Sequence, residues 1–280
     1  MNELCTAVLG LGIMGKSLAD NLNEDGLLVA SWNRSPKPDA PKFVTSIEDA
    51  VRDATLLMIV VIDGQAVSEV IDMIEPLLSE KHIVIQCSTV KPEENISCKD
   101  RVESRNAAFV EALIGGSKVA AIQRKIPFYL GGEKAIADKI EPVLARISGK
   151  RIYVGEVGTA SVAKLAMNLN LAIQIEALCE SYAYAISNGL SDDQYFEVLR
   201  NNAGWNYLCE YKESKLRERE YSPQFSIRNM LKDVHLALDT DKTDEGMSLL
   251  EKTESIYQAG ENAGLGDEDM IALYKLTHHG

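Results

Sequence analysis

Three polar side chains interrupt an apolar stretch in the middle of the chain, at a spacing that suits proton transfer. Ser161, Lys164 and Asn168 lie in "GEVGTASVAKLAMNLNLA", residues 155–172, and spacings of three and four residues place them on one helix face. Burial on an apolar helix lowers the pKa of a lysine, so Lys164 could exchange a proton near neutral pH. Asn168 could hydrogen-bond the amine or a substrate oxygen. From these residues alone, a polar stripe that meets solvent or a charged neighbour also explains the pattern.

Three glycines near the N-terminus have the G-x-G-x-x-G spacing of a dinucleotide-binding turn. They lie in "AVLGLGIMGKSLADNL", residues 7–22, between an apolar run and a helical pattern. Gly10 would permit the tight turn, Gly12 would admit a pyrophosphate to the backbone, and Gly15 would let the helix pack on the strand. A glycine-rich turn without a ligand is the alternative. The predicted cofactor-binding residues of this turn are Gly10, Leu11, Gly12, Ile13, Met14 and Gly15.

The end of the second apolar run indicates which dinucleotide would bind. An NAD site usually carries Asp or Glu about 20 residues after the glycines, to accept hydrogen bonds from the ribose 2′-hydroxyl. Here the sequence reads "SWNRSPK", with Asn33 at that position and no carboxylate to repel a 2′-phosphate. Arg34 offers a planar guanidinium suited to phosphate, Ser35 a hydroxyl and Lys37 a point charge. These residues favour NADP(H), although a solvated basic turn would have the same composition.

The elements that must position these residues alternate in type over the first half of the chain. Apolar runs typical of strands cover residues 4–10, 27–32, 55–61, 82–87, 107–114, 127–131 and 151–155. Helical patterns between them cover residues 16–24, 47–52, 65–78, 93–103 and 133–147. This alternation predicts βαβ units, and right-handed crossovers then make a doubly wound parallel sheet, covered on both faces, the simplest topology.

No run after residue 159 reads as a strand. Residues 159–187 read as one long helix that is apolar over most of its circumference, and it should therefore be buried between other elements. Further helical patterns cover residues 191–201, 206–219, 225–240, 244–264 and 267–276. We therefore predict an α/β fold, with a Rossmann-type domain at 1–157 and an all-helical substrate and dimerisation domain at 158–280, joined by the long helix. Burial against a second subunit is consistent with a homodimer or higher homo-oligomer.

The net charge and the distribution of apolar residues indicate which kinds of binding partner the protein could have. The formal net charge is −13, so the chain as a whole repels polyanions and nucleic acid is not an expected partner. No stretch approaches the roughly 18 uninterrupted apolar residues of a membrane span, and the N-terminal segment lacks the regions of a signal peptide. We therefore expect a small-molecule partner and no membrane association.

The cysteines and histidines are scattered along the chain. Five cysteines have no C-x-x-C spacing, which indicates reduced thiols and a cytoplasmic location rather than a disulfide framework. The histidines have no metal-ligand spacing, and no metal site is predicted. They are His82, His235, His278 and His279.

Five motifs, in order along nearly the whole chain, resemble those of the β-hydroxyacid dehydrogenase family. This family includes 3-hydroxyisobutyrate dehydrogenases, tartronate semialdehyde reductases and plant-type glyoxylate/succinic semialdehyde reductases. The matching segments are "GLGIMGKSLADNL" (10–22), "CSTV" (87–90), "VEALIGGSKVA" (110–120), "GEVGTASVAKLAMN" (155–168) and "FSIRNMLKDVHLA" (225–237).

The resemblance implies a role for each matched residue. Lys164 would be the catalytic acid/base and Asn168 its positioning partner. Lys232 would reach the cofactor and substrate from the second domain, oriented by Asp233. The residues that would contact substrate are Ser88, Gly115, Gly116, Phe225 and Asp233. Those that would also contact the cofactor are Val61, Ile62, Thr89 and Lys232.

The chain departs from the family pattern in its substrate loop. Where the family commonly reads Pro-Val-Ser-Gly-Gly, this sequence reads "LIGGS", so Gly115 replaces a serine expected to help bind a substrate carboxylate. Backbone N–H groups of the glycine turn, or Ser117, could replace that hydroxyl. Ala160 stands where the catalytic segment has its third glycine. These changes affect the expected substrate more than the hydride chemistry.

The implied reaction is hydride transfer between NADPH and a small carbonyl compound or β-hydroxyacid, with Lys164 exchanging the proton. Two other functions remain open. An NADPH-dependent imine reductase would typically lack the lysine at position 164. A non-catalytic NADP-binding sensor is kept open by Gly115. Trp205 and Tyr207 could line the substrate site or pack in the core.

Overall fold

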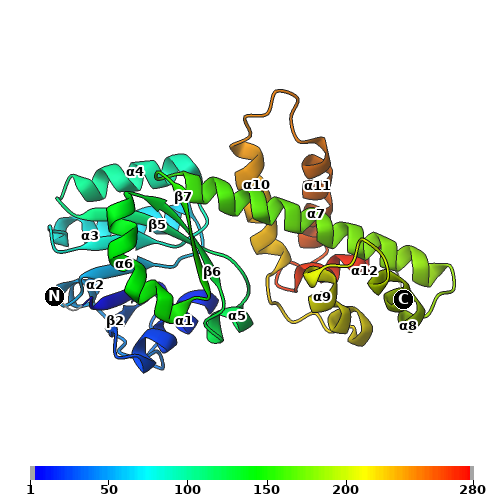
Figure 1. Ribbon diagram of the computed structural model, residues 1–280, viewed down its shortest axis with the longest axis horizontal. Coiled ribbons are helices and arrows are strands. Elements are labelled where there is room, and N and C mark those ends of the chain that lie inside the picture. The colour runs from blue at the N-terminus through cyan, green and yellow to red at the C-terminus, as the bar shows by residue number, and fades with distance from the viewer. Residues whose placement is uncertain (1–3, 278–280) are drawn as a thin grey trace. The chain divides into compact units, whose positions relative to one another are not determined.

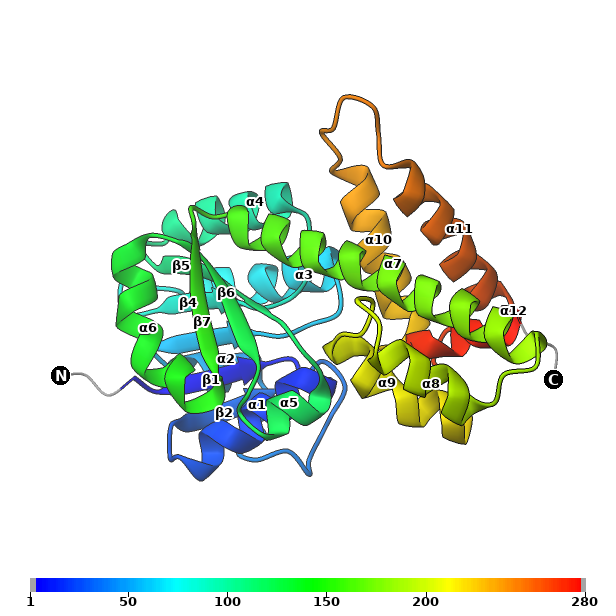
Figure 2. The same ribbon diagram turned by 45° about the vertical axis from the view of Figure 1, so that its right-hand side comes forward.

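The computed structural model describes residues 4–277, in two compact units (Figures 1 and 2). Of the described residues, 4–164 form unit 1 and 165–277 form unit 2. The predicted domain boundary at 157/158 lies just before helix α7 (Thr159–Ser187), whereas the compact units divide within this helix, after Lys164. The first turns of α7 therefore belong to unit 1 and the remainder to unit 2.

Unit 1 is built on a seven-stranded sheet, and each strand coincides with a predicted apolar run. The order is β2-β1-β3-β4-β5-β6-β7. The strands are β1 (Thr6–Leu9), β2 (Leu28–Trp32), β3 (Leu56–Ile59), β4 (Ile83–Gln86), β5 (Ala108–Ile114), β6 (Pro127–Gly132) and β7 (Lys150–Gly155). The chain reverses its direction of winding between β1 and β3, which is where doubly wound sheets bind their ligands.

The sheet is parallel except at one place. β5 and β6 are antiparallel, with Leu113 paired to Tyr129. The connection between them contains only the short helix α5 (Lys118–Ile122), which cannot run back along the whole sheet as a parallel crossover requires. The sequence did not predict α5. The expectation of a fully parallel sheet was wrong, because the sheet is parallel except between β5 and β6.

Helices cover both faces of the sheet, as expected from strands that are apolar on both sides. One face packs against α1 (Ile13–Glu24), α5 and α6 (Lys134–Ile147) through a core that includes Leu18, Phe128 and Leu144. The other face packs against α2, α3 and α4 through a core that includes Ile59, Val70 and Val102. These last helices, with the short turn η1, are α2 (Ile47–Arg52), α3 (Gly64–Ile74), η1 (Glu75–Leu77) and α4 (Pro92–Glu103).

Among the described residues of unit 2, 165–277, all the elements are helices. Its elements after α7 are α8 (Asp192–Arg200), α9 (Tyr207–Glu218), α10 (Ile227–Asp239), α11 (Ser248–Asn262), η2 (Met270–Leu273) and α12 (Tyr274–Thr277). α11 begins four residues later than predicted, because Gly246 has φ +75° and ends the preceding turn. The core gathers around the buried face of α7, where Tyr182 packs against Phe196 and Tyr274.

α7 is buried on one face and exposed on the other. It has the length and hydropathy of a membrane span, yet Ala172, Ile175 and Cys179 are core residues of unit 2. The exposed face carries Met167, 50% exposed, and Tyr184, 73% exposed. We predicted that α7 is buried around most of its circumference, but within one chain only one face of the helix is buried.

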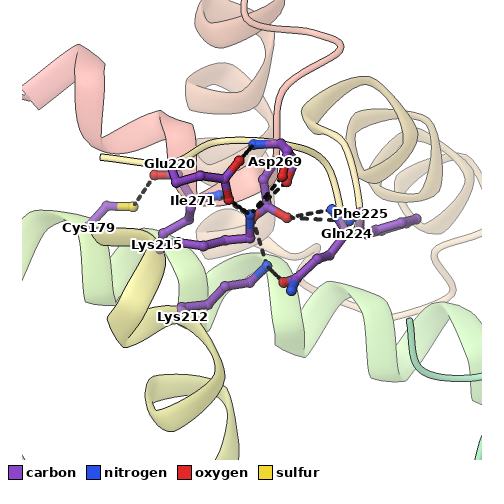
Figure 3. A network of polar contacts seen from close by, with 9 residues as sticks. Cys179, Lys212, Lys215, Glu220, Gln224, Phe225, Asp269 and Ile271 are labelled. Atoms are coloured by element: carbon purple, nitrogen blue, oxygen red, sulfur yellow. Dashed lines mark hydrogen bonds and ion pairs between the residues drawn. The ribbon is translucent and has the colours of Figure 1, made fainter. Parts of the chain in front are cut away.

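A buried ion pair holds the segment between α9 and α10 against η2 (Figure 3). Lys212 Nζ lies 2.7 Å from Asp269 Oδ1, and the two side chains are 1% and 0% exposed. Asp269 also accepts hydrogen bonds from the backbone N–H groups of Gln224 and Ile271. Beside it, Lys215 donates to Glu220 and to the Ser222 carbonyl. Burial lowers the pKa of Lys212, and the Asp269 carboxylate opposes that effect.

Candidate functional site

The glycine turn after β1 has the geometry that the sequence predicts. Gly10 adopts φ +107°, and a side chain there would collide with the Val60 carbonyl. A side chain at Gly15 would collide with the Gly10 carbonyl, so this glycine lets α1 pack closely on the turn. By contrast, no atom lies within 4 Å of the position that a Cβ on Gly12 would take. The space above Gly12 therefore leaves its backbone open to a ligand.

The N-terminus of α1 faces the same turn. Gly12 caps the helix without a side-chain hydrogen bond, the first turn has no acidic residue, and the first intrahelical bond runs from Lys16 N to Gly12 O. The N–H groups of residues 13–15 therefore have no intrahelical acceptor, and the helix dipole favours negative charge at this end. Open space above a glycine together with such N–H groups fits a pyrophosphate.

Asn33, at the end of β2, connects the loop after β2 to the glycine turn after β1 by hydrogen bonds. Its Oδ1 accepts a hydrogen bond of 2.8 Å from the Leu11 N–H, and its Nδ2 donates to the Ser35 carbonyl at 2.8 Å. The side chain predicted to face the ribose thus also fixes the backbone of the glycine turn. Ser35 and Lys37 are exposed on the same loop.

Arg34 has a carboxylate partner that the sequence analysis missed. Its Nη1 lies 2.8 Å from Glu69 Oε2 on α3, and Gln65 donates to the other carboxylate oxygen at 3.0 Å. Both members of the ion pair are partly exposed to solvent. Glu69 is 35 residues from Arg34, and no local spacing in the sequence connects them.

The other predicted residues of unit 1 follow the carboxyl ends of three neighbouring strands. Val61 and Ile62 follow β3, Ser88 and Thr89 follow β4, and Gly115 follows β5. Since β1, β3, β4 and β5 are parallel, these segments lie at the same sheet edge as the glycine turn, with Gly116 next to Gly115. The Ser88 hydroxyl accepts a hydrogen bond of 2.8 Å from the Val61 N–H. The structure thus brings the loops after β3 and β4 together.

A buried hydrogen-bond network continues from Ser88 into the interior. The Gln86 amide bonds the backbone of Ser88 and donates to Asn95 Oδ1 at 2.7 Å. Asn95 Nδ2 donates to Glu111 Oε1 at 2.5 Å and to Ser161 Oγ at 2.8 Å. All five side chains are buried. None except Ser88 and Ser161 was singled out from the sequence, although a glutamate in the apolar run "AAFVEALI" was a usable signal.

Glu111 attaches the start of α7 to the sheet. Its Oε2 accepts hydrogen bonds from the N–H groups of Gly158 (2.7 Å) and Ala160 (3.3 Å), and its Oε1 accepts one from Ser161 Oγ (2.9 Å). Burial raises the pKa of Glu111, while these hydrogen bonds oppose the rise. The anchor lies one turn before Lys164, which is itself buried. Glu111 therefore fixes the helical turn that precedes Lys164.

In unit 2, three predicted residues form one cluster. Asn168 Nδ2 donates to Asp233 Oδ2 at 2.5 Å, and Lys232 Nζ donates to Asp233 Oδ1 at 2.7 Å. Asp233 is buried, so α7 and α10 are joined through its carboxylate. Phe225 lies just before α10, half-buried against the core of unit 2.

The substrate loop after β5 makes hydrogen bonds of its own. Gly116 adopts φ +85°, and the Gly115 N–H donates to the Pro127 carbonyl at 2.9 Å. Ser117, one candidate to replace the missing serine, accepts a hydrogen bond from the Ala120 N–H as the N-cap of α5. The Gly115 N–H donor and the Ser117 hydroxyl acceptor therefore already have partners within the protein.

Other side chains named from the sequence lie as follows. Trp205 is half-buried against the core of unit 2, and Arg200 lies over its ring, whereas Tyr207 is exposed and stacks on Tyr211. Residues 4–277 contain no group of three or more His, Cys, Asp or Glu side chains that could hold a metal ion. His278 and His279 lie outside the described residues.

Models of known protein families match both halves of the chain. Residues 6–155 match a family model described as the NAD binding domain of 6-phosphogluconate dehydrogenase. Residues 158–277 match one described as the NAD-binding domain of NADP-dependent 3-hydroxyisobutyrate dehydrogenase. The chain is 27% identical over 276 residues to glyoxylate/succinic semialdehyde reductase 1 of Arabidopsis thaliana, covering 95% of each chain.

Solved structures of similar fold include a dehydrogenase and an imine reductase. The 3-hydroxyisobutyrate dehydrogenase of Mycobacterium tuberculosis, solved with L-serine, has a TM-score of 0.88 and 24% identity, with 99% of each chain covered. An imine reductase from Pseudomonas sp. has a TM-score of 0.64 and 22% identity, covering 99% of this chain and 100% of that one. The overall fold is therefore more similar to that of the dehydrogenase.

Proposed function

Because the chain belongs to the β-hydroxyacid dehydrogenase family and has a nicotinamide-cofactor domain, we propose that it is an NADP(H)-dependent oxidoreductase acting on small semialdehydes or β-hydroxyacids. The observation that carries this proposal is the buried network of unit 1. It joins Val61 and Ser88, at the sheet edge of the glycine turn, to Glu111 and the first turn of α7. One set of hydrogen bonds thus fixes both the predicted cofactor loops and the turn before Lys164.

Lys164 is the proposed acid/base. In reduction its ammonium group donates a proton to the substrate carbonyl oxygen, and in oxidation the neutral amine accepts the hydroxyl proton. Asn168 orients the amine or the substrate oxygen, and Asp233 holds Asn168 in place. Asp233 also orients the Lys232 ammonium. When bound, the nicotinamide cofactor supplies or accepts the hydride.

The preference for NADP(H) is supported by the loop after β2. Arg34, Ser35 and Lys37 offer donors and positive charge, and no carboxylate occupies the position of Asn33. On a chain of net charge −13, a phosphate must be bound by such local cations. Glu69 opposes this preference, because it shares the charge of Arg34.

The substrate class is supported by the name of the Arabidopsis relative, which acts on glyoxylate and succinic semialdehyde according to that name. Both are small aldehyde acids. We also propose that the protein is a homodimer, since α7 exposes apolar side chains such as Met167 and Tyr184 that a second copy would cover. Sedimentation velocity across a concentration series would test this, and a monomer throughout would refute it.

NADPH oxidation with glyoxylate, succinic semialdehyde and a cyclic imine tests the proposed reaction. We expect turnover with an aldehyde acid, and Lys164→Ala should lower kcat by roughly 10²–10⁴-fold while leaving NADPH affinity unchanged, because only the proton transfer is lost. Lys139→Ala, an exposed lysine on α6, serves as the matched control. Turnover of the imine alone, retained in Lys164→Ala, would favour an imine reductase. NADPH binding without any turnover would favour a non-catalytic sensor.

A further inference from the structure

The side-chain space of Gly115 is occupied by its neighbouring strand. A Cβ atom on Gly115 would lie 2.7 Å from Pro127 Cγ and 3.3 Å from the Tyr129 hydroxyl oxygen, both on β6. A proline ring cannot swing aside, so a serine would not fit here without displacing the strand. Position 115 therefore lacks a side chain and has the Tyr129 hydroxyl next to it.

Strand register places Tyr129 on the side of the sheet that carries α7. Leu113 of β5 pairs with Tyr129, and Glu111 pairs with Gly131, so these side chains share one face. On that face Glu111 binds the first turn of α7, and a Cβ on Gly131 would lie 3.2 Å from the Ala160 Cβ. Tyr129 thus lies on the same face of unit 1 as the turn that precedes Lys164.

The Tyr129 residue is half-buried, and its hydroxyl has no hydrogen-bond partner among residues 4–277. Two polar groups of the neighbouring loop are engaged, because the Gly115 N–H donates to the Pro127 carbonyl and the Ser117 hydroxyl accepts from the Ala120 N–H. A phenol O–H is a hydrogen-bond donor. Its strongest partner is an ionised oxygen acceptor such as a carboxylate.

We propose that Tyr129 is a substrate-orienting residue, whose hydroxyl donates a hydrogen bond to the carboxylate of a small aldehyde acid. It replaces the side-chain hydroxyl that Gly115 lacks. This proposal rests on the proposed function and adds to it the group that selects acids over neutral aldehydes. The Pro127 ring and the Tyr129 ring also limit the room beside the loop, which favours short substrates.

The variant Tyr129→Phe removes the hydroxyl and keeps the ring. With NADPH saturating, we expect kcat/KM for succinic semialdehyde to fall by roughly 10–100-fold, the usual range for a hydrogen bond to a charged group. We expect kcat/KM for butyraldehyde, which has the same carbon count and no carboxylate, to change by less than about twofold, and NADPH affinity to stay constant. The matched control is Tyr153→Phe, whose hydroxyl donates to the Gly132 carbonyl in the same sheet.

A rescue variant separates substrate binding from a structural effect. In the Tyr129→Phe background, Pro127→Ala makes room for Gly115→Ser, and the new serine should restore part of the preference for succinic semialdehyde over butyraldehyde. If the wild-type protein turns over succinic semialdehyde and Tyr129→Phe leaves the ratio of kcat/KM for succinic semialdehyde to that for butyraldehyde unchanged, the role of Tyr129 would be overturned. The proposed function would not be affected by that result. A wild-type protein that turns over no aldehyde acid would overturn the proposed function, and this assignment with it.

Discussion

Arg34 illustrates how a single residue's neighbours set its affinity for a ligand. The guanidinium is paired with Glu69 at 2.8 Å, so the 2′-phosphate that we propose it binds would compete with the carboxylate of α3 for the same donors. Exposed ion pairs of this kind are weak, and the phosphate carries more charge than the carboxylate. Glu69 should therefore reduce the preference for NADPH without abolishing it.

Two variants test this competition. Arg34→Ala should weaken NADPH binding by about tenfold or more and leave NADH affinity nearly unchanged, because only NADPH has the 2′-phosphate. Glu69→Gln should strengthen NADPH binding by about two- to fivefold, with NADH again unaffected. Nucleotide fluorescence titrations would give all four dissociation constants. Equal losses for both nucleotides in Arg34→Ala would show that this side chain does not bind the 2′-phosphate.

At the scale of the element, α7 contains a carboxyl group that its surroundings do not accommodate. Glu176 is 7% exposed, and its Oε2 is buried without a hydrogen-bond partner among the described residues. Burial raises the pKa of Glu176 to about 7, with a smaller contribution from the Glu180 carboxylate. Near pH 7 this group is therefore divided between its protonated and ionised forms.

The raised pKa makes the stability of unit 2 depend on pH. The folded state holds the proton more tightly than the unfolded chain, so the stabilisation is complete below about pH 4.5 and is lost as pH rises through about 7. Glu176→Gln should therefore raise the free energy of unfolding at pH 8 by up to about 3 kcal/mol relative to wild type, and by little at pH 5. Urea titrations at both pH values would measure this, with the exposed Glu210→Gln as control. A gain of equal size at pH 5 and pH 8 would contradict it.

The elements themselves were largely predictable from the sequence. All seven strands coincide with apolar runs. In β1, β3 and β4 every residue is buried, so these strands do not alternate, whereas the edge strand β7 is only half-buried or exposed. The bounds of α2 and α7 agree with the predicted ranges. The missed features depend on contacts distant in sequence. α5 is too short for a periodic pattern, and the antiparallel pairing of β6 follows from that short connection. The hydrogen-bond partners of Glu111 lie in α4 and around the start of α7, and Gly115, the neighbour of the Tyr129 hydroxyl, lies in the loop after β5, so no local spacing could reveal them.

At the scale of the whole molecule, each unit has its own core and its own tryptophan. Trp32 is buried in unit 1, and Trp205 is half-buried in unit 2. The buried Lys212–Asp269 pair belongs entirely to unit 2 (Figure 3). Removing one member of such a pair leaves an uncompensated buried charge, which typically costs about 3–5 kcal/mol.

Asp269→Ala should therefore destabilise unit 2 and spare the nucleotide-binding unit. In a Trp32→Phe background, Trp205 is the remaining tryptophan, and its fluorescence reports the unfolding of unit 2. We expect the midpoint of this urea transition to move to a lower urea concentration, while NADPH affinity in the absence of urea is retained. Lys212→Met with Asp269→Asn should recover most of the loss, since it removes the buried charge and keeps an acceptor for the backbone N–H groups. Asp267→Ala, at an exposed ion pair, is the control. A parallel loss of NADPH affinity would contradict this independence of the units.

The hydrogen bond from the Leu11 N–H to Asn33 has a consequence for protein engineering. In this fold, NAD sites usually carry an acid about 20 residues after the glycine turn, where it hydrogen-bonds the ribose 2′-hydroxyl. Here Asn33 at that position also braces the glycine turn, so an aspartate or glutamate in its place would have to accept the same Leu11 N–H hydrogen bond while also facing the ribose. A redesign that leaves Asn33 in place and alters residues 34 and 69 would change nucleotide choice without loosening the turn.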